Sequence, residues 1–322
     1  MSSLNKVEKI EFRGNNSIFF RIWFFGVVLS LISLGIYAPW AIVNNRKYIY
    51  RNTYFVNHNF DYHADPLVIL KGYIFLLIYA FILFLNYKFI NPKIALLIFI
   101  LTLPVLIFKI LKYHINNISY NGELFFFKGD FISMYKLFIL NFILNIFTIF
   151  IAFPFSMKKI YDYIYGNIQV GENILSINTR VNLFYVLYLL SLLIYITISI
   201  FLYISYFEIL NIFESINRYY LQNENLFVSW KVNMIYLISS NLILLFLIFQ
   251  YITHKQLKIV YNSIYIGKYK SIYTTSIFTY IIISIKNLFL IFITFGLYLP
   301  IAKLNKMKYH LSSITFECKN IN

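Results

Sequence analysis

Cysteine is almost absent from this sequence, and charged residues are scarce. The chain has one cysteine, Cys318, in 322 residues, which excludes a disulfide framework or a cysteine-based metal site within one chain. Charged residues make up 12% of the chain and hydrophobic residues 60%, whereas a soluble domain has about 25% and about 45–50%. One soluble core cannot bury that excess. The composition therefore predicts an integral membrane protein.

Acidic residues are also few, with 12 Asp and Glu against 28 Lys and Arg and a net charge of +16. Nucleic-acid-binding proteins can have a similar balance. Here most basic residues flank apolar runs, as the positive-inside bias of membrane proteins predicts. We therefore expect the lipid bilayer and anionic lipid headgroups as partners, and not nucleic acid. A homo-oligomer or another membrane partner stays open.

Catalytic and nucleotide-binding motifs are missing too. The patterns G-x-S-x-G, H-E-x-x-H, Walker A and G-x-G-x-x-G do not occur, so we expect neither an enzyme nor a cofactor. The segment HNFDYHAD at residues 58–65 contains four residues of metal-ligand type. In an extended strand His58 would face away from Asp61, His63 and Asp65. A solvated hairpin arm explains this segment better than a metal site.

Long apolar runs dominate what is present. They cover about residues 18–43, 67–86, 93–111, 131–156, 181–210, 232–253 and 276–302. A run of about 17–25 apolar residues is long enough to cross a bilayer as a helix. Seven crossings are therefore the simplest interpretation.

A short pattern recurs after several of these runs. Tyr48 lies nine residues after Pro39, and Asn52 lies thirteen after it. The same offsets connect Pro104 with Tyr113 and Asn117, Pro154 with Tyr163 and Asn167, and Pro300 with Tyr309 and Ser313. A further copy at Asn262 lacks the proline and has Lys258 in place of the tyrosine. We interpret the pattern as an internal repeat, with units at about 10–63, 64–127, 127–178, 179–272 and 273–318.

An alternating stretch with a turn residue follows each of the copies that end before residue 270. The turn residue is Gly122, Gly171 or Gly267, and Asn57 is its counterpart in the first copy. Glycine and asparagine tolerate positive φ angles, so each stretch predicts a short β-hairpin.

The basic residues discriminate between two topologies. With seven full crossings, Lys and Arg divide almost evenly between the two sides. If the runs at 18–43, 131–156 and 276–302 instead enter and return on one side, the outer loops hold only Lys88, Lys93, Arg218 and Lys231. The positive-inside rule expects such an asymmetry. We therefore predict an α-helical membrane protein with four full transmembrane helices, three broken re-entrant segments, and cytoplasmic β-hairpins and termini; seven transmembrane helices are the alternative.

Three groups of residues are candidates for structural or functional roles within this topology. The candidate helix-break positions are Gly35, Pro39, Pro154, Gly296 and Pro300. The candidate intramembrane polar site is Lys286, Asn287 and Asn141, because polar groups inside a membrane are costly; a snorkelling lysine and asparagines that cross-link helices are the alternatives. The candidate interfacial and lipid-headgroup residues are Arg46, Lys47, Tyr48, Lys158, Lys159, Lys306 and Lys308.

Several stretches resemble a known family. FRGNNSIFFRIW, SLGIYAPWAIVNNRKYIYRNTYF, LKYHINNISYNGELFF and TFGLYLPIAKLNKMKYHLSSITF together resemble YjgN-type bacterial inner-membrane proteins, a family of unknown molecular function. The resemblance covers most of the chain and is most specific near residues 12–63. It departs at Phe155 and Ile301, where the first unit has Trp40. It implies a location in the bacterial inner (cytoplasmic) membrane, and it supplies no reaction, ligand or catalytic residue.

Two functions fit these observations. The first is transport or permeation of a small neutral or anionic solute, because internal repeats and broken membrane segments are typical of transporter cores. The second is a non-transporting membrane scaffold whose cytoplasmic β-hairpins bind lipid headgroups or a partner protein. We take the first as the prediction and the second as its alternative.

Overall fold

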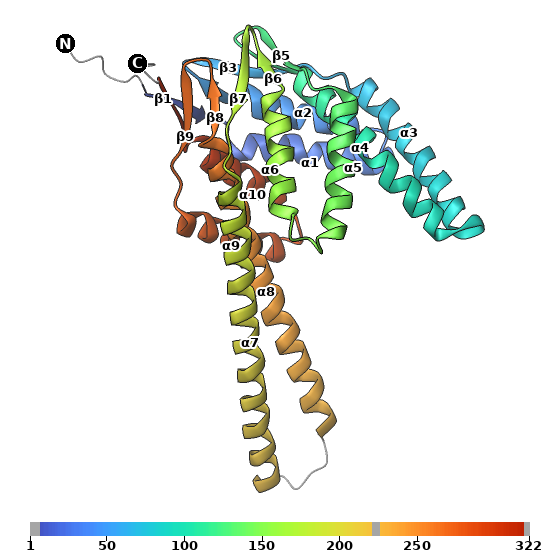
Figure 1. Ribbon diagram of the computed structural model, residues 1–322, viewed down its shortest axis with the longest axis vertical. Helices are drawn as coiled ribbons and strands as arrows, with labels where there is room; N and C mark the ends of the chain where they lie inside the picture. Colours follow the sequence, from blue (N-terminus) through green and yellow to red (C-terminus); the bar gives the residue numbers. More distant parts are fainter. Residues whose placement is uncertain (1–6, 221–225, 319–322) are drawn as a thin grey trace, which may run out of the picture.

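The computed structural model describes residues 7–220 and 226–318 of the chain. Strands lie at one end of the molecule and the helices extend away from them (Figure 1). The ten strands are β1 (Val7–Phe12), β2 (Thr53–Phe55), β3 (His58–Tyr62), β4 (Ile118–Tyr120), β5 (Glu123–Phe127), β6 (Ile168–Val170), β7 (Asn173–Ile177), β8 (Ile264–Ile266), β9 (Tyr269–Tyr273) and β10 (Ile314–Cys318). The helices are α1 (Asn16–Ile32), α2 (Ala38–Arg51), α3 (Pro66–Leu85), the π-helix η1 (Asn86–Ile90), α4 (Pro92–Asn116), α5 (Phe131–Phe147), α6 (Phe153–Gly166), α7 (Val181–Tyr220), α8 (Leu226–Tyr261), α9 (Ile277–Ile293) and α10 (Leu299–Leu311).

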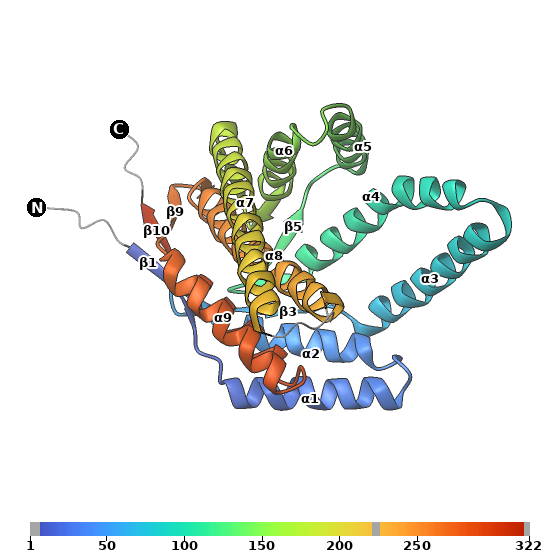
Figure 2. The ribbon, with the colours of Figure 1, turned by 90° about the horizontal axis from the view of Figure 1, so that it is seen from below.

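The elements follow one order, strand, helix, helix, strand, five times along the chain. We call these stretches units 1 to 5, so that unit 1 contains β1, α1, α2 and β2, and unit 4 contains β7, α7, α8 and β8. The helix pairs radiate around the strands when the molecule is seen from the helical end (Figure 2). Neighbouring units touch through α2 and α3, α4 and α5, α6 and α7, α8 and α9, and α10 and α1.

The ten strands close into one antiparallel barrel. Within each unit the two strands pair with each other, and a hairpin turn then joins one unit to the next. The turn residues Asn57, Gly122, Gly171 and Gly267 all have positive φ angles, of 63°, 83°, 56° and 55°. The barrel closes through β1 and β10, where Glu8 pairs with Phe316. The sequence pattern predicts hairpins, but the closed barrel was not expected from it.

Alternate residues of each strand point into the barrel, because side chains of a strand alternate between its faces. The inward positions nearest the helices form a layer that we call the base layer. Several of its members are almost completely buried, including Tyr62, Tyr273, Ile314 and Phe127, which are 0–4% exposed. They belong to hydrophobic clusters that also include helix residues. The base layer is Phe12, Thr53, Tyr62, Ile118, Phe127, Ile168, Ile177, Ile264, Tyr273 and Ile314.

Helix lengths separate the units into two kinds. Among the described residues, four helices are long and apolar enough to cross a membrane: Pro66–Phe89, Pro92–Asn116, Val181–Glu208 and Ile235–Tyr261. The helices α1, α5 and α9 have 17 residues each, or about 25 Å at 1.5 Å per residue, which is less than the bilayer core of about 30 Å. The four candidate spans agree with the four full transmembrane helices expected from the sequence. That the three shorter segments re-enter on one side, in place of the alternative of seven transmembrane helices, stays a prediction.

The three short helix pairs share one reversal. Gly35 and Gly296 have φ angles of 92° and 91°, and Phe150 takes the equivalent place with φ 62°. The backbone N–H of each donates to the carbonyl five residues earlier, at 2.7–2.8 Å, as in a Schellman helix end. The predicted break prolines Pro39, Pro154 and Pro300 then lie in the first turn of α2, α6 and α10, where a missing N–H costs little.

Pro104 has the same spacing to its tyrosine as the other three prolines, yet it lies inside the 25-residue helix α4. In unit 2 the chain reverses farther out, around Asn91. Proline at this position therefore does not by itself end a helix, and the reversal depends on the residues before it.

Candidate anion site at the barrel base

A tyrosine in the second helix of four units fastens the start of the first helix. The hydroxyl of Tyr48 accepts from the N–H of Asn15 at 2.7 Å and donates to its carbonyl at 2.8 Å. Tyr113 contacts Asp65 in the same way, and Tyr309 contacts Ser276, while Tyr163 donates to the Asp130 carbonyl. We call this contact the tyrosine lock. It explains the recurring tyrosine found in the sequence.

Unit 4 has no tyrosine at this position. Asn178 N–H donates to the Ser263 carbonyl, as Arg13 does to Asn52 and His63 to Asn117 in units 1 and 2. Ser263 is therefore the counterpart of those asparagines, and Ile259, four residues earlier, is the counterpart of the tyrosine. This corrects the sequence alignment, which took Asn262 and Lys258 for that pair and was wrong by one residue.

The residue that the tyrosine contacts, immediately before the first helix, also differs in unit 4. Asn15, Asp65, Asp130 and Ser276 stand immediately before the first helix of units 1, 2, 3 and 5. Arg180 stands there in unit 4, immediately before α7. An isoleucine side chain has no hydroxyl to bond the backbone at Arg180, and a pocket lies at this place.

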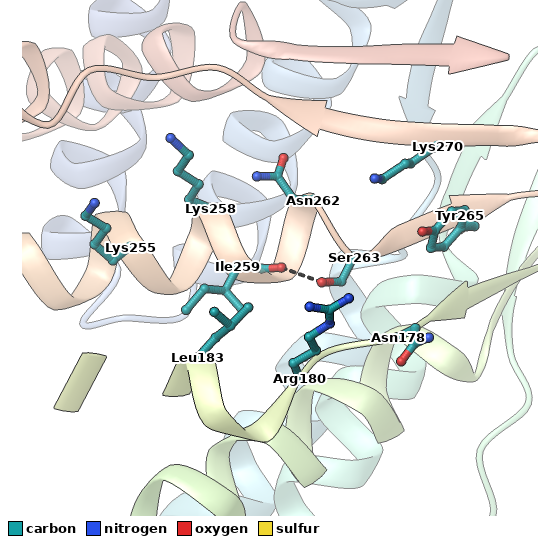
Figure 3. A pocket seen from close by; sticks show the side chains of 10 residues that line it. All are labelled: Asn178, Arg180, Leu183, Lys255, Lys258, Ile259, Asn262, Ser263, Tyr265 and Lys270. Atoms are coloured by element: carbon teal, nitrogen blue, oxygen red, sulfur yellow. Dashed lines mark hydrogen bonds between the residues drawn. The ribbon is translucent and has the colours of Figure 1, made fainter. Parts of the chain in front are cut away.

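This pocket, which we call the basic pocket, has a volume of about 430 Å³. Figure 3 shows its side chains arranged around one opening. Four of them are cationic and come from α7's start, α8 and β9: Arg180, Lys255, Lys258 and Lys270. In the part of the chain that the structure describes, the remaining lining residues are uncharged: Asn178, Leu183, Ile259, Asn262, Ser263 and Tyr265.

The chemistry of this lining favours an anion. Guanidinium and ammonium groups donate charge-assisted hydrogen bonds to phosphate or carboxylate oxygens, and Asn178, Asn262 and Tyr265 can add neutral ones. The four cations repel one another, and a bound anion would lower that electrostatic energy. The Ser263 hydroxyl is already used, since it donates to the Ile259 carbonyl at 2.7 Å (Figure 3).

The candidate intramembrane polar residues do not form one site. Lys286 is exposed on α9, whereas its neighbour Asn287 is 3% exposed and donates to the Ala302 carbonyl at 3.2 Å. Asn141 is 9% exposed on α5, in a different helix pair, and its carbonyl accepts from the Asn145 amide at 2.8 Å. Two of the three residues therefore take part in contacts within or between helices.

The candidate headgroup residues divide into two groups. Arg46 donates to the Tyr62 hydroxyl at 2.8 Å, and Lys306 donates to the Gln250 side chain at 3.0 Å, so both are tied to neighbouring elements. Lys308 donates to Asn16, Lys158 pairs with Asp162, and Tyr48 forms its lock. Lys47 is half-buried, and Lys159 is exposed with its ammonium 5.5 Å from the Phe155 ring.

Three of the four His and Asp side chains in the HNFDYHAD segment form polar contacts within the fold. Asp61 pairs with Arg51 at 2.9 Å. Burial alone would raise the pKa of Asp61, but hydrogen bonds from Arg51 and the Tyr62 N–H outweigh it and the pKa is lowered. His63 contacts the Ser119 hydroxyl, and Asp65 caps α3. Within residues 7–220 and 226–318, no three His, Cys, Asp or Glu side chains are grouped as metal ligands.

A family model described as "bacterial protein of unknown function (DUF898)" matches residues 7–320. The chain belongs to the DUF898 family. Among curated relatives, inner membrane protein YjgN of Escherichia coli (strain K12) is 28% identical over 120 residues, which are 36% of this chain and 30% of that protein. Inner membrane protein YjgN of Salmonella typhimurium (strain LT2) is 30% identical over 127 residues, 38% of this chain and 32% of that protein.

The matched region thus spans about a third of the length of each YjgN relative. No solved structure matches the chain. The DUF898 and YjgN matches support the family resemblance seen in the sequence, and the curated relatives are named inner membrane proteins. They assign no ligand.

The basic pocket was not expected from the sequence. Lys255 and Lys258 have the same spacing as Lys109 and Lys112 of α4, so their pattern alone is not distinctive. The informative signal is the isoleucine at the tyrosine position, and it was hidden because the repeat was aligned on Asn262.

Proposed function

We propose that this DUF898 protein is a multi-pass inner-membrane protein that binds the phosphate of an anionic phospholipid headgroup in the basic pocket, with its barrel on the cytoplasmic side. The observation that supports this proposal best is the change in unit 4. There Ile259 and Arg180 replace the tyrosine lock, and four cations line the space that results.

The position of the pocket along the helices supports a lipid ligand. Arg180 precedes the membrane-spanning part of α7, which begins at Val181, and the spanning part of α8 ends at Tyr261. The pocket therefore lies at the ends of two candidate spans, and on the proposed topology this is the depth of lipid phosphates. Anionic lipids attract basic residues at the cytoplasmic surface. The cytoplasmic assignment of the barrel rests on the asymmetry of Lys and Arg between the loops.

Permeation of a small neutral or anionic solute stays a prediction from the sequence. Two observations make binding the better-supported function. Buried Phe, Tyr and Ile side chains of the base layer lie across the barrel lumen, and Lys286 is exposed and does not line the basic pocket.

The proposal can be tested with purified protein in detergent and a phosphatidylglycerol that carries a fluorescent acyl chain. Replacing Lys255 and Lys258 together by Gln should weaken binding about tenfold or more, because each charge-assisted hydrogen bond contributes about 1.5–3 kcal/mol. Ile259→Tyr should abolish binding by filling the pocket, and the fold should tolerate it because four units already have tyrosine there.

Unit 2 supplies the matched control. Lys109 and Lys112 occupy the positions of Lys255 and Lys258, but Tyr113 forms its lock with Asp65 beside them. The Lys109→Gln, Lys112→Gln variant should bind the lipid like the wild type. Equal losses in both double variants would mean non-specific attraction and contradict the proposal. Competition by glycerol 3-phosphate as strong as by phosphatidylglycerol would instead assign a soluble phosphate compound.

A further inference from the structure

The barrel contains a second cavity, separate from the basic pocket. It lies on the far side of the base layer from the helices, among the inward residues nearest the hairpin turns, and we call it the cup. Its volume is about 740 Å³. All ten strands contribute to its lining: Ile10, Phe55, Phe60, Tyr120, Glu123, Phe125, Val170, Asn173, Leu175, Ile266, Tyr269, Phe316 and Cys318, with Gly267 and Lys268 from a turn.

The cup opens away from the helices. Every strand joins its helix at the base-layer end, and the hairpin turns lie at the opposite end (Figure 1). The base layer closes the inner end with buried side chains. A ligand in the cup would therefore enter from the aqueous side of the barrel and not from the membrane.

Aromatic rings form one continuous wall of the cup. The Phe55 ring centroid lies 5.0 Å from that of Phe316 and 5.9 Å from that of Tyr120, and the Phe60 ring lies 4.8 Å from Tyr120. The Tyr120 hydroxyl donates to the Phe55 carbonyl at 2.8 Å, which holds its ring in place. Burial, and next the charge of Glu8, raises the pKa of Tyr120, so this hydroxyl keeps its proton at neutral pH.

The mouth of the cup has a negatively charged and a positively charged residue. Glu123 is the one carboxylate and Lys268 the one ammonium among the described residues that line it. The Glu123 carboxylate lies against Gly171, where a Cβ atom would overlap it, and the Asn173 side-chain oxygen lies 3.1 Å from the place of a Cβ on Gly267. These two residues thus reach over the following hairpin turns, and carboxylate, amide and ammonium follow one another along this arc of the rim.

We propose that the cup binds a zwitterionic molecule with a flat, aromatic body, such as an aromatic amino acid or a compound of that class. The body stacks on the wall of Phe55, Phe60 and Tyr120, where paired aromatic rings are attracted beyond the burial of their area. The ammonium of the ligand faces Glu123 and its carboxylate faces Lys268. The lining of the cup includes one carboxylate and one ammonium, which suits a ligand that itself has both an ammonium and a carboxylate.

Four compounds that share the indole ring and differ in their charged groups separate the contributions. They are tryptophan, tryptamine, indole-3-propionate and 3-methylindole, each titrated calorimetrically into the detergent-solubilised full chain. Tryptophan should bind most tightly and 3-methylindole most weakly, with a difference of about tenfold or more. Equal affinity for all four compounds, or binding of none of them, would overturn the proposal.

Two rim variants test the assigned contacts, and both residues are exposed, so the fold should persist. Glu123→Gln should weaken the binding of tryptophan and tryptamine and leave the binding of indole-3-propionate unchanged. Lys268→Gln should weaken the binding of indole-3-propionate and leave the binding of tryptamine unchanged. Glu172→Gln is the matched control, since Glu172 is exposed in a neighbouring turn and does not line the cup. Ile259→Tyr should leave tryptophan affinity unchanged, which separates this site from the basic pocket. Equal effects of Glu123→Gln on all probes would refute the assignment.

Discussion

Single residues decide how the equivalent positions of the five units differ. Ile259 and Arg180 replace a tyrosine and a helix-capping residue, and their exchange leaves a cationic pocket in unit 4. Phe150 is a second example, because it adopts φ 62° where Gly35 and Gly296 stand in units 1 and 5. A residue with a Cβ atom pays about 1–2 kcal/mol for the left-handed conformation.

Phe150→Gly should therefore stabilise the protein. The expected gain in the free energy of unfolding is about 0.5–1 kcal/mol, since the relief of strain exceeds the entropy that glycine adds to the unfolded chain. Phe150 is 65% exposed in the structure, so little packing is lost. Titration with denaturing detergent in mixed micelles measures this. Gly35→Ala is the control and should lower the same free energy; a destabilised Phe150→Gly variant would show that the turn is not strained.

At the scale of elements, a hydroxyl connects the two helices of each short pair. The side chains of Ser33, Thr148 and Thr294 accept hydrogen bonds from the N–H four residues later, at 2.9, 3.2 and 3.0 Å. That N–H belongs to the reversal between the helices and has no carbonyl of a preceding helical turn to bond. In a membrane an unbonded N–H is costly. The hydroxyl thus stabilises the start of the returning helix.

Thr294→Val removes this acceptor and keeps the shape of the side chain. We expect a loss of about 1–3 kcal/mol in the free energy of unfolding, because the Tyr298 N–H is left without its partner. Thr294→Ser should lose much less, as serine performs this role in unit 1. The same micelle titration compares the two variants, and similar losses in both would assign the effect to packing of the threonine methyl group.

At the scale of the whole molecule, the barrel determines the arrangement of the helices. Because every unit starts and ends on a barrel strand, each helix pair must leave the barrel and return to it (Figures 1 and 2). Each helix pair returns to the barrel that it left, so all hairpin turns between units lie on the same side of the membrane as the barrel. The far end of the α3–α4 pair, at Asn91, lies at the other end of two candidate spans.

Cysteine labelling tests this arrangement in a Cys318→Ser background. A membrane-impermeant maleimide applied to intact spheroplasts should modify an Asn91→Cys variant and leave an Asn57→Cys variant unmodified until the membrane is opened. Both positions are exposed, so access through the membrane is the only expected difference. Modification of both variants in intact spheroplasts would contradict the proposed topology.

The sequence by itself determined the class of protein, the choice of the four apolar runs that form candidate spans, and the turn residues of the hairpins. These follow from local properties: composition, the length of apolar runs, the distribution of Lys and Arg, and glycine or asparagine where φ is positive. Gly35 and Gly296 could be found in this way, whereas the glycine-like role of Phe150 could not, because its side chain carries no such signal.

Only the tertiary structure decided that ten short strands form one closed barrel with a cup, and that Ile259 faces Arg180. Strands of three residues have little preference for a partner, and closure needs β1 to pair with β10 from the other end of the chain. The register of unit 4 was ambiguous by one residue in the sequence, since Asn262 and Ser263 are adjacent polar residues. The hydrogen bond from Asn178 to Ser263 resolves it, and a one-residue shift in a strand moves every side chain to the opposite face.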